Sequence, residues 1–208
     1  MRIASVKPSQ RKKGRFLVEM EDGGILRVTE EELLRFSLRE GMELDGGELE
    51  ALEASARASA ARGAAANIIG SRPLSKQELT RRLVRKGAAE EDAGAAADWL
   101  EEIGAVNDRE YAAMLVRHYA GKGYGKARIR EEMRRRGVDR ELWDEALEEL
   151  PDQSETLDRL IQKKCRGDLS DRREVKRVSD SLLRRGFSWS EVKEALRRYT
   201  ELLEDESC

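Results

Sequence analysis

The sequence of 208 residues contains an internal repeat, and this repeat restricts the possible fold more than any other feature. Three segments align without gaps on a glycine that follows basic residues: Leu74–Gly87, Tyr124–Gly137 and Arg173–Gly186. Apolar residues stand eight and four positions before each glycine, namely Leu79 and Leu83, Ile129 and Met133, and Val178 and Leu182. The glycines are 50 and 49 residues apart, a period typical of stacked repeat proteins.

Each aligned segment predicts a helix that ends at its glycine. The two apolar residues are four positions apart and share one helix face, and glycine is the residue best able to adopt the left-handed conformation after a helix. An upstream helix is expected to end at a loop around 71–73, 121–123 or 167–168. A third helix is expected around Ala93–Leu100, Arg140–Leu150 and Ser190–Leu203. Such three-helix units bury little surface alone, so we expect tandem repeats stacked into an elongated curved rod.

Composition supports a mainly α fold. Charged residues make up 39% of the chain and aromatic residues 5%, which suits amphipathic helices that each bury one stripe. The aromatic residues Trp99, Trp143 and Trp189 lie in or beside the expected third helices, where we expect core packing.

The first part of the chain differs from the repeats and predicts a small β-hairpin plus helix. Short apolar stretches flank a turn at Glu21-Asp22-Gly23-Gly24, and Thr29 with Glu32 forms a capping-box pattern. The Ala-rich stretch Glu48–Ile69 is expected to form a connector helix. The predicted boundaries are 1–47 for the N-terminal extension, 48–108 for the connector and repeat 1, 109–151 for repeat 2, 152–203 for repeat 3 and 204–208 for an acidic tail.

A net charge of −2 hides a strong segregation of charge along the chain. Residues 1–15 carry six bases and no acid, whereas residues 16–60 carry twelve acids and four arginines. Residues 72–140, which contain the first two aligned segments, and residues 155–199, which contain the third, are basic overall. Parts of the helical region could therefore face phosphate or an acidic protein surface.

Few residues could support catalysis or metal binding. His118 is the single histidine and is expected to be half-buried or at a helix surface, and Cys165 and Cys208 lack the spacing of a zinc site. The glycine-rich stretch Gly121–Lys126 lacks P-loop spacing and is expected to be a loop between helices. We therefore expect no enzyme activity and no cofactor. Without a secretory signal or a long apolar run, we also expect a cytoplasmic, monomeric protein that does not enter a membrane.

Several stretches resemble the bacterial RecX family. They are Trp99–Asp108 with Glu110-Tyr111-Ala112, Gly123-Tyr124-Gly125 through Arg136-Gly137-Val138, and Arg184–Ser188. The N-terminal hairpin and Leu38–Leu44 resemble an extension found in part of that family. The resemblance covers roughly residues 1–200. It implies tandem three-helix repeats and a modulator, usually an inhibitor, that binds the RecA–DNA filament and limits its extension, ATP hydrolysis and strand exchange.

Basic residues on the three aligned helices are the candidate partner-binding residues. They are Arg81, Arg82, Arg85, Lys86, Lys126, Arg128, Arg130, Arg134, Arg135, Arg136, Arg172, Arg173, Lys176, Arg177, Arg184 and Arg185. Recurrence at equivalent positions favours a periodic basic row against the RecA filament or a single-stranded or duplex DNA backbone. The plainer alternative is a solvated helix face that complements the helix dipole.

Two other functions are compatible with the sequence. A helix-turn-helix protein would place a basic helix directly in the DNA major groove, although the bases are dispersed over three repeats. A helical adaptor for another protein is the third hypothesis.

Overall fold

The computed structural model describes residues 1–10, 12–165 and 171–205, with side chains up to residue 201. The chain forms two compact units, Met1–Pro73 with Glu78–Val106, and Leu74–Gln77 with the chain from Asn107 onward. Single repeats are not separated by this division, so the predicted repeat boundaries stay predictions.

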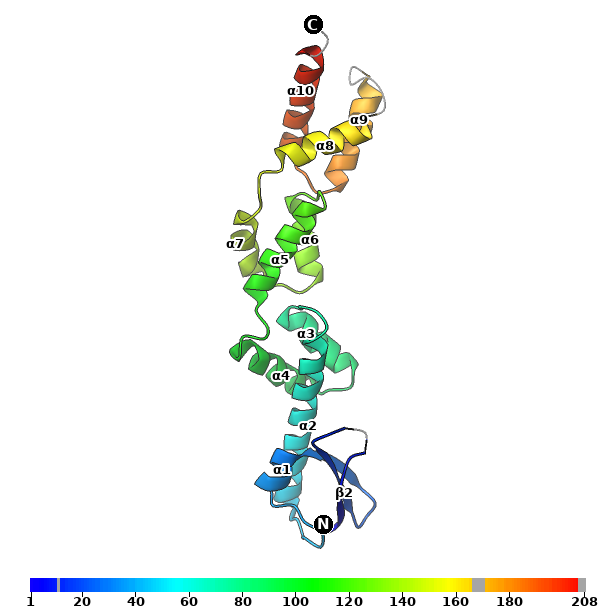
Figure 1. Ribbon diagram of the computed structural model, residues 1–208, viewed down its shortest axis with the longest axis vertical. Helices are drawn as coiled ribbons and strands as arrows, with labels where there is room; N and C mark the ends of the chain where they lie inside the picture. Colours follow the sequence, from blue (N-terminus) through cyan, green and yellow to red (C-terminus); the bar gives the residue numbers. More distant parts are fainter. Residues whose placement is uncertain (11, 166–170, 206–208) are drawn as a thin grey trace. The chain divides into compact units, whose positions relative to one another are not determined.

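The fold is mainly helical, with one small sheet near the N-terminus (Figure 1). The strands are β1 (Ile3–Pro8), β2 (Arg15–Met20) and β3 (Ile25–Thr29). The helices are α1 (Glu30–Arg35), α2 (Gly46–Ile69), α3 (Lys76–Arg85), α4 (Glu90–Glu102), α5 (Asp108–Gly121), α6 (Lys126–Arg135), the 3-10 turn η1 (Arg140–Leu142), α7 (Trp143–Glu148), α8 (Ser154–Lys164), α9 (Arg172–Arg184) and α10 (Trp189–Asp205).

The N-terminal module is a three-stranded antiparallel sheet with the order β1-β2-β3. The predicted hairpin joins β2 to β3, with Phe16 opposite Val28 and Gly23 at φ +89 in the turn. β1 pairs along the other edge of β2, which places Val6 opposite Val18. The buried side chains of Val18 and Val28 form a core with Leu52 of α2. The sheet therefore packs against a helix, which a small hairpin needs in order to be stable in water.

Glu32 ties the short helix α1 to α2. The predicted capping box is confirmed, because the Thr29 side chain accepts from the Glu32 backbone and the Glu32 carboxylate accepts from the Thr29 backbone. The other carboxylate oxygen accepts hydrogen bonds from the hydroxyls of Ser55 and Ser59 in α2. A buried carboxylate with these donors fixes how α1 sits on α2.

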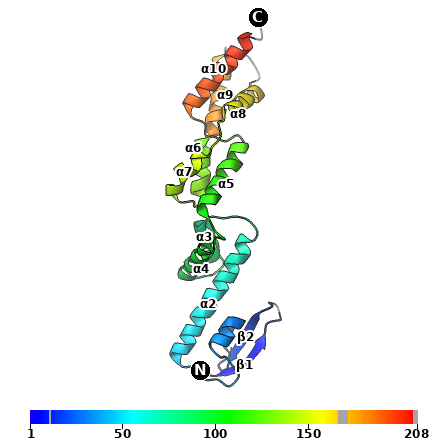
Figure 2. The ribbon, with the colours of Figure 1, turned by 60° about the vertical axis from the view of Figure 1, so that its left-hand side comes forward.

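The predicted connector is a single helix, α2, which runs from the sheet module to α4 (Figure 2). It begins at Gly46, after a capping box of Asp45 and Glu48. Gly63 does not break the helix. It lies beside Arg15, whose guanidinium donates to the Ser59 carbonyl at 3.1 Å, and a Cβ at Gly63 would lie 3.2 Å from that guanidinium.

The aligned segments form α3, α6 and α9, as predicted. All six predicted apolar residues, two in each helix, are fully buried. Gly87, Gly137 and Gly186 adopt left-handed backbone with φ of +94, +71 and +89, as the C-terminal position requires. The expected third helices are α4, η1 with α7, and α10. The loop predicted at 167–168 lies outside the described residues.

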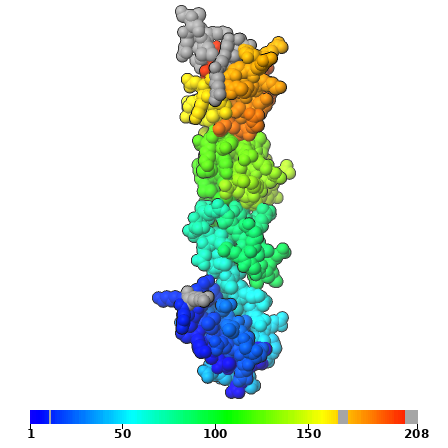
Figure 3. All heavy atoms as spheres, turned by 90° about the vertical axis from the view of Figure 1, so that its right-hand side faces the viewer, coloured from blue at the N-terminus to red at the C-terminus, as the bar shows by residue number. Residues whose placement is uncertain are grey.

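Repeat 2 (α5, α6, η1 and α7) and repeat 3 (α8, α9 and α10) each have a core of their own. They meet where the turn after α9 reaches the start of α6. The amides of Gly125 and Ala127 donate to the carbonyls of Arg185 and Gly186, at 2.9 and 3.0 Å. A Cβ at Gly186 would overlap the Arg128 backbone nitrogen. Figure 3 shows the green atoms of repeat 2 directly against the yellow and orange atoms of repeat 3.

A second joint in this unit is made by side chains, at the start of the first aligned segment. The Ser75 hydroxyl donates to the carbonyl of Arg136, and a Cβ at Gly137 would overlap the side chain of Gln77. Ser75 stands twelve positions before its aligned glycine, as Gly125 does. In the first joint, Arg185 and Gly186 contact the start of α6. In the second, Arg136 and Gly137 contact the residues at the start of α3.

The prediction for Trp189 is wrong, whereas Trp143 is half-buried against the core of repeat 2. Trp143 donates its indole N–H to the Val138 carbonyl at 3.0 Å. Trp189 is 59% exposed, because Phe187 fills the core of repeat 3 at this turn. None of the helices in the described residues has the length and apolar character of a membrane span.

Alanine at Gly125 tests the joint between repeats 2 and 3. A methyl group there overlaps the Gly186 carbonyl, so we expect the free energy of unfolding in urea to fall by about 1–3 kcal/mol. Gly121→Ala is the matched control, because a Cβ there meets no atom within 4 Å, and we expect a change within about 0.5 kcal/mol. Equal effects of the two substitutions would show that the joint does not hold the repeats.

Candidate partner-binding surfaces

Three of the predicted binding residues surround one buried acid, Glu132 of α6. The Glu132 side chain is 3% exposed, and Arg135 donates to its carboxylate at 2.6 Å. Arg128 forms an ion pair with Glu132 at 3.1 Å, and the Tyr119 hydroxyl donates to it at 3.0 Å. Arg136 completes the cluster with its Nε 3.9 Å from the carboxylate. We call these residues the Glu132 cluster.

Arg136 turns inward, toward two tyrosines of α5. Its guanidinium donates to the hydroxyls of Tyr111 at 3.0 Å and Tyr119 at 3.3 Å. The cluster therefore joins α5 to α6 inside repeat 2. Arg128, Arg135 and Arg136 support the fold of this repeat, whatever else they contact.

Glu132 remains charged in this setting. Burial by itself raises the pKa of its carboxyl group, but the hydrogen bonds from Arg135 and Tyr119 and the nearby positive charges lower the pKa below the ordinary value of 4.5. Burial lowers the pKa of Arg136, whereas its hydrogen bonds with Tyr119 and Tyr111 raise it, with a net increase.

The outward-facing bases of α6 are Lys126, Arg130 and Arg134. Arg130 pairs with Asp144 at 2.9 Å, and Arg134 pairs with Glu131 at 2.7 Å. Exposed ion pairs contribute only about 0–1 kcal/mol, so a partner's carboxylates or phosphates can replace these acids at little cost.

One face of α9 carries a basic stripe, which we define as Arg173, Lys176, Arg177 and Arg184. These side chains line a shallow groove together with Asp180. Their spacing of three, four and seven residues places them on one side of the helix. In the part of the chain that the structure describes, the side chains of Arg173, Lys176 and Arg184 make no ion pair. The stripe is thus available to an acidic partner.

The remaining predicted bases of the second unit differ in their surroundings. Arg172 is exposed at the start of α9. Arg177 pairs with Glu174 at 2.5 Å. Arg185 donates to the carbonyls of Lys122 at 3.2 Å and Gly123 at 3.1 Å, so it serves the joint between repeats.

In the first unit, Arg81, Arg85 and Lys86 are exposed on α3 and at its end. Arg82 is half-buried and pairs with Glu78 at 2.6 Å. Residues at equivalent repeat positions thus have unequal roles. Lys86 is exposed, whereas its counterparts Arg136 and Arg185 turn inward.

Comparisons with known proteins identify the family. Residues 107–147 match the description "RecX, second three-helix domain", and residues 152–196 match "RecX, third three-helix domain". The regulatory protein RecX of Pseudomonas entomophila (strain L48) is 36% identical over 124 residues, which are 59% of this chain and 80% of that protein. The chain belongs to the RecX family. The regulatory protein RecX of Xanthomonas axonopodis pv. citri (strain 306) is 37% identical over 61% of this chain and 79% of that protein.

A crystal structure of a regulatory protein RecX has the same fold. It superposes with a TM-score of 0.75 and 24% identity over 95% of this chain and 98% of that chain. RecX relatives are named as regulatory proteins. Among the described residues, no three histidine, cysteine, aspartate or glutamate side chains are grouped so that they could hold a metal ion.

Sequence reasoning missed the central residue of this RecX-family repeat. Glu132 was not predicted to organise the basic residues, although a signal was present. Arg128 stands four positions before it, and Arg135 and Arg136 stand three and four positions after it. At these spacings three cations reach one carboxylate on a helix.

Glutamine at position 132 is expected to destabilise repeat 2 by about 2–3 kcal/mol, because several arginine groups lose a charged acceptor. Urea unfolding followed by circular dichroism measures the change. Glu131→Gln is the matched control. Among the described residues, Glu131 forms an ion pair only with the exposed Arg134. We therefore expect this substitution to change the free energy of unfolding by no more than about 1 kcal/mol. A loss of equal size in both variants would contradict the role of the cluster.

The contribution of Glu132 also depends on pH. Its folded-state pKa is lowered, so its stabilisation is fully present above about pH 4.5 and is lost as the pH falls through the folded-state pKa. We expect the stability difference between the wild-type protein and Glu132→Gln to be constant from pH 7 to 5 and to shrink at lower pH. A difference that persisted unchanged at pH 2 would rule out a charged Glu132 as its source.

Proposed function

We propose that this protein binds the filament of the RecA recombinase and inhibits its ATP hydrolysis, its extension and its strand exchange. The observation that carries the proposal is membership of the RecX family, whose relatives are named regulatory proteins. We further propose that it acts in the cytoplasm, in DNA repair by homologous recombination and in the SOS response, without catalysis of its own.

The basic stripe on α9 supports an electrostatic mode of binding. Its exposed cations suit an acidic protein surface or the phosphates of DNA inside the filament. The outward-facing bases of α6 extend the same chemistry to repeat 2. Binding by consecutive repeats to adjacent RecA protomers would hinder the addition of protomers and the subunit movements that accompany ATP turnover.

The proposal is tested by the ATPase activity of the cognate RecA on single-stranded DNA, with this protein titrated in. We expect a dose-dependent loss of ATP turnover at ratios up to one molecule per RecA protomer. An unchanged rate of ATP hydrolysis by RecA across this range would contradict the proposal. Tight, sequence-dependent binding to duplex DNA without RecA would then favour the helix-turn-helix alternative.

Charge reversal on α9 tests the electrostatic contacts. In the triple variant Arg173→Glu, Lys176→Glu and Arg184→Glu, we expect half-maximal inhibition to need about ten times more protein, because repulsion replaces attraction. The matched control reverses three exposed bases of the same unit outside α6 and α9, which are Arg140, Lys163 and Lys193. Equal losses would show that net charge, not the stripe, matters. Arg135 and Arg136 are unsuitable for this test because they hold Glu132.

Inhibition by the wild-type protein is expected to weaken as salt rises from about 50 to 200 mM, because screening weakens contacts between exposed charges. The triple variant should depend less on salt. Inhibition that did not change with salt would contradict the electrostatic part of the proposal and leave family membership as its support.

A further inference from the structure

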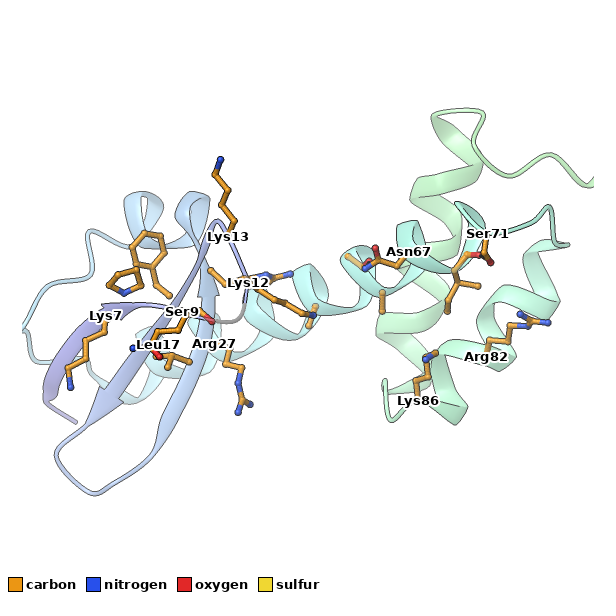
Figure 4. A pocket seen from close by; sticks show the side chains of 18 residues that line it. Lys7, Ser9, Lys12, Lys13, Leu17, Arg27, Asn67, Ser71, Arg82 and Lys86 are labelled. Carbon is orange, nitrogen blue, oxygen red and sulfur yellow. Dashed lines mark hydrogen bonds between the residues drawn. The ribbon is translucent and has the colours of Figure 1, made fainter.

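The first unit contains a basic groove that the proposed RecA contacts do not use. Its walls come from the sheet on one side and from α3 on the other, and α2 passes between them (Figure 4). Its volume is about 1460 Å³. We call it the N-terminal groove.

All the charged residues that line this groove are basic. Among the described residues, seven lysines and arginines line the groove, and no aspartate or glutamate does. Three of them have partners, since Lys7 pairs with Glu19, Arg15 donates to the Ser59 carbonyl and Arg82 pairs with Glu78. The other four are Lys12, Lys13, Arg27 and Lys86, and in the part of the chain that the structure describes they make no ion pair.

This arrangement favours an anionic ligand. Like charges gathered in one concave surface repel each other, and a groove focuses their field outward. An acid placed among them would have relieved the repulsion, as Glu132 does in repeat 2. None of the described residues that line the N-terminal groove is an acid, so the charge remains available to a ligand.

The ligand must be extended. Figure 4 shows Lys12, Lys13 and Arg27 on the sheet side and Lys86 on the side of α3, at the other end of the groove. A single phosphate group cannot contact both sets. A chain of phosphates can, because its charges recur along its length.

The apolar part of the lining, which we call the floor of the groove, indicates single strands. It includes Pro8, Phe16, Leu17, Ala64 and Ile68. Duplex DNA presents its phosphates outward and keeps its bases stacked inside, so it offers nothing to such a floor. A single strand offers unstacked bases, which pack on apolar and aromatic side chains, and phosphates, which reach the basic walls.

We propose that the N-terminal groove binds the backbone of single-stranded nucleic acid, independently of RecA. Lys12, Lys13, Arg27 and Lys86 contact phosphates, and the apolar floor contacts bases without reading their sequence. This binding adds a second ligand to the protein and does not rest on the function proposed above.

Fluorescence anisotropy with a labelled oligothymidylate of about 20 nucleotides tests this site in the 208-residue chain, without RecA. We expect alanine at Lys12, Lys13, Arg27 and Lys86 together to weaken binding at least tenfold. The slope of log K against log salt should fall in magnitude by about 3, since each lost phosphate contact accounts for about 0.7.

The control replaces four exposed bases elsewhere, Arg39, Arg140, Lys163 and Lys193, by alanine, and removes the same charge. Its affinity should stay within about threefold of the wild-type value. Equal weakening in both variants, or no binding of the oligothymidylate, would overturn the proposal. Preferential binding of a duplex of equal length would also overturn it. Binding of polyglutamate but not of the oligothymidylate would assign the groove to an acidic protein instead.

Discussion

Repeats 2 and 3 depend on a contact between backbones, made where the aligned glycine Gly186 meets the start of α6. At Gly186 and Gly125 the approach leaves no room for a Cβ on either residue, and two carbonyls accept the first amides of α6. Those amides have no acceptor within their own helix, so the joint satisfies groups that every helix leaves open. A single turn thus ends one helix and caps another, and each three-helix core can stay small because its neighbour supplies this support.

Much of this architecture could be predicted from the repeat alone. The apolar pairs of α3, α6 and α9 and the three left-handed glycines follow from local sequence rules, because helix periodicity and backbone conformation depend on neighbouring residues. The joints could not be predicted in this way. They bring residues such as Ser75 and Arg136 together from positions far apart in the chain, and no local pattern reports a contact of that kind.

The candidate site was harder to predict than the fold. Basic residues look alike in a sequence, but the structure divides them by what they touch. Arg136 and Arg185 are committed to hydrogen bonds inside the protein, whereas Arg173, Lys176 and Arg184 face outward on α9. The division depends on whether a tyrosine, a carboxylate or a free carbonyl lies within reach, and tertiary structure alone decides that. The N-terminal groove shows the opposite case, where unpaired bases from separate elements converge on one surface.

The joints also give the array a direction. Repeats 1 and 2 have a residue with a minimal side chain, Ser75 or Gly125, at the position that receives a later turn. Repeat 3 has Glu174 at the corresponding position, and this glutamate pairs with Arg177. Glu174 lies inside α9, three residues after the N-cap Asp171, whereas Gly125 is itself the N-cap of α6. The three repeats are therefore not interchangeable, because α9 begins about one turn earlier relative to its aligned glycine than α6 does, and the residue that receives a later turn in repeat 2 has no equivalent at the beginning of α9.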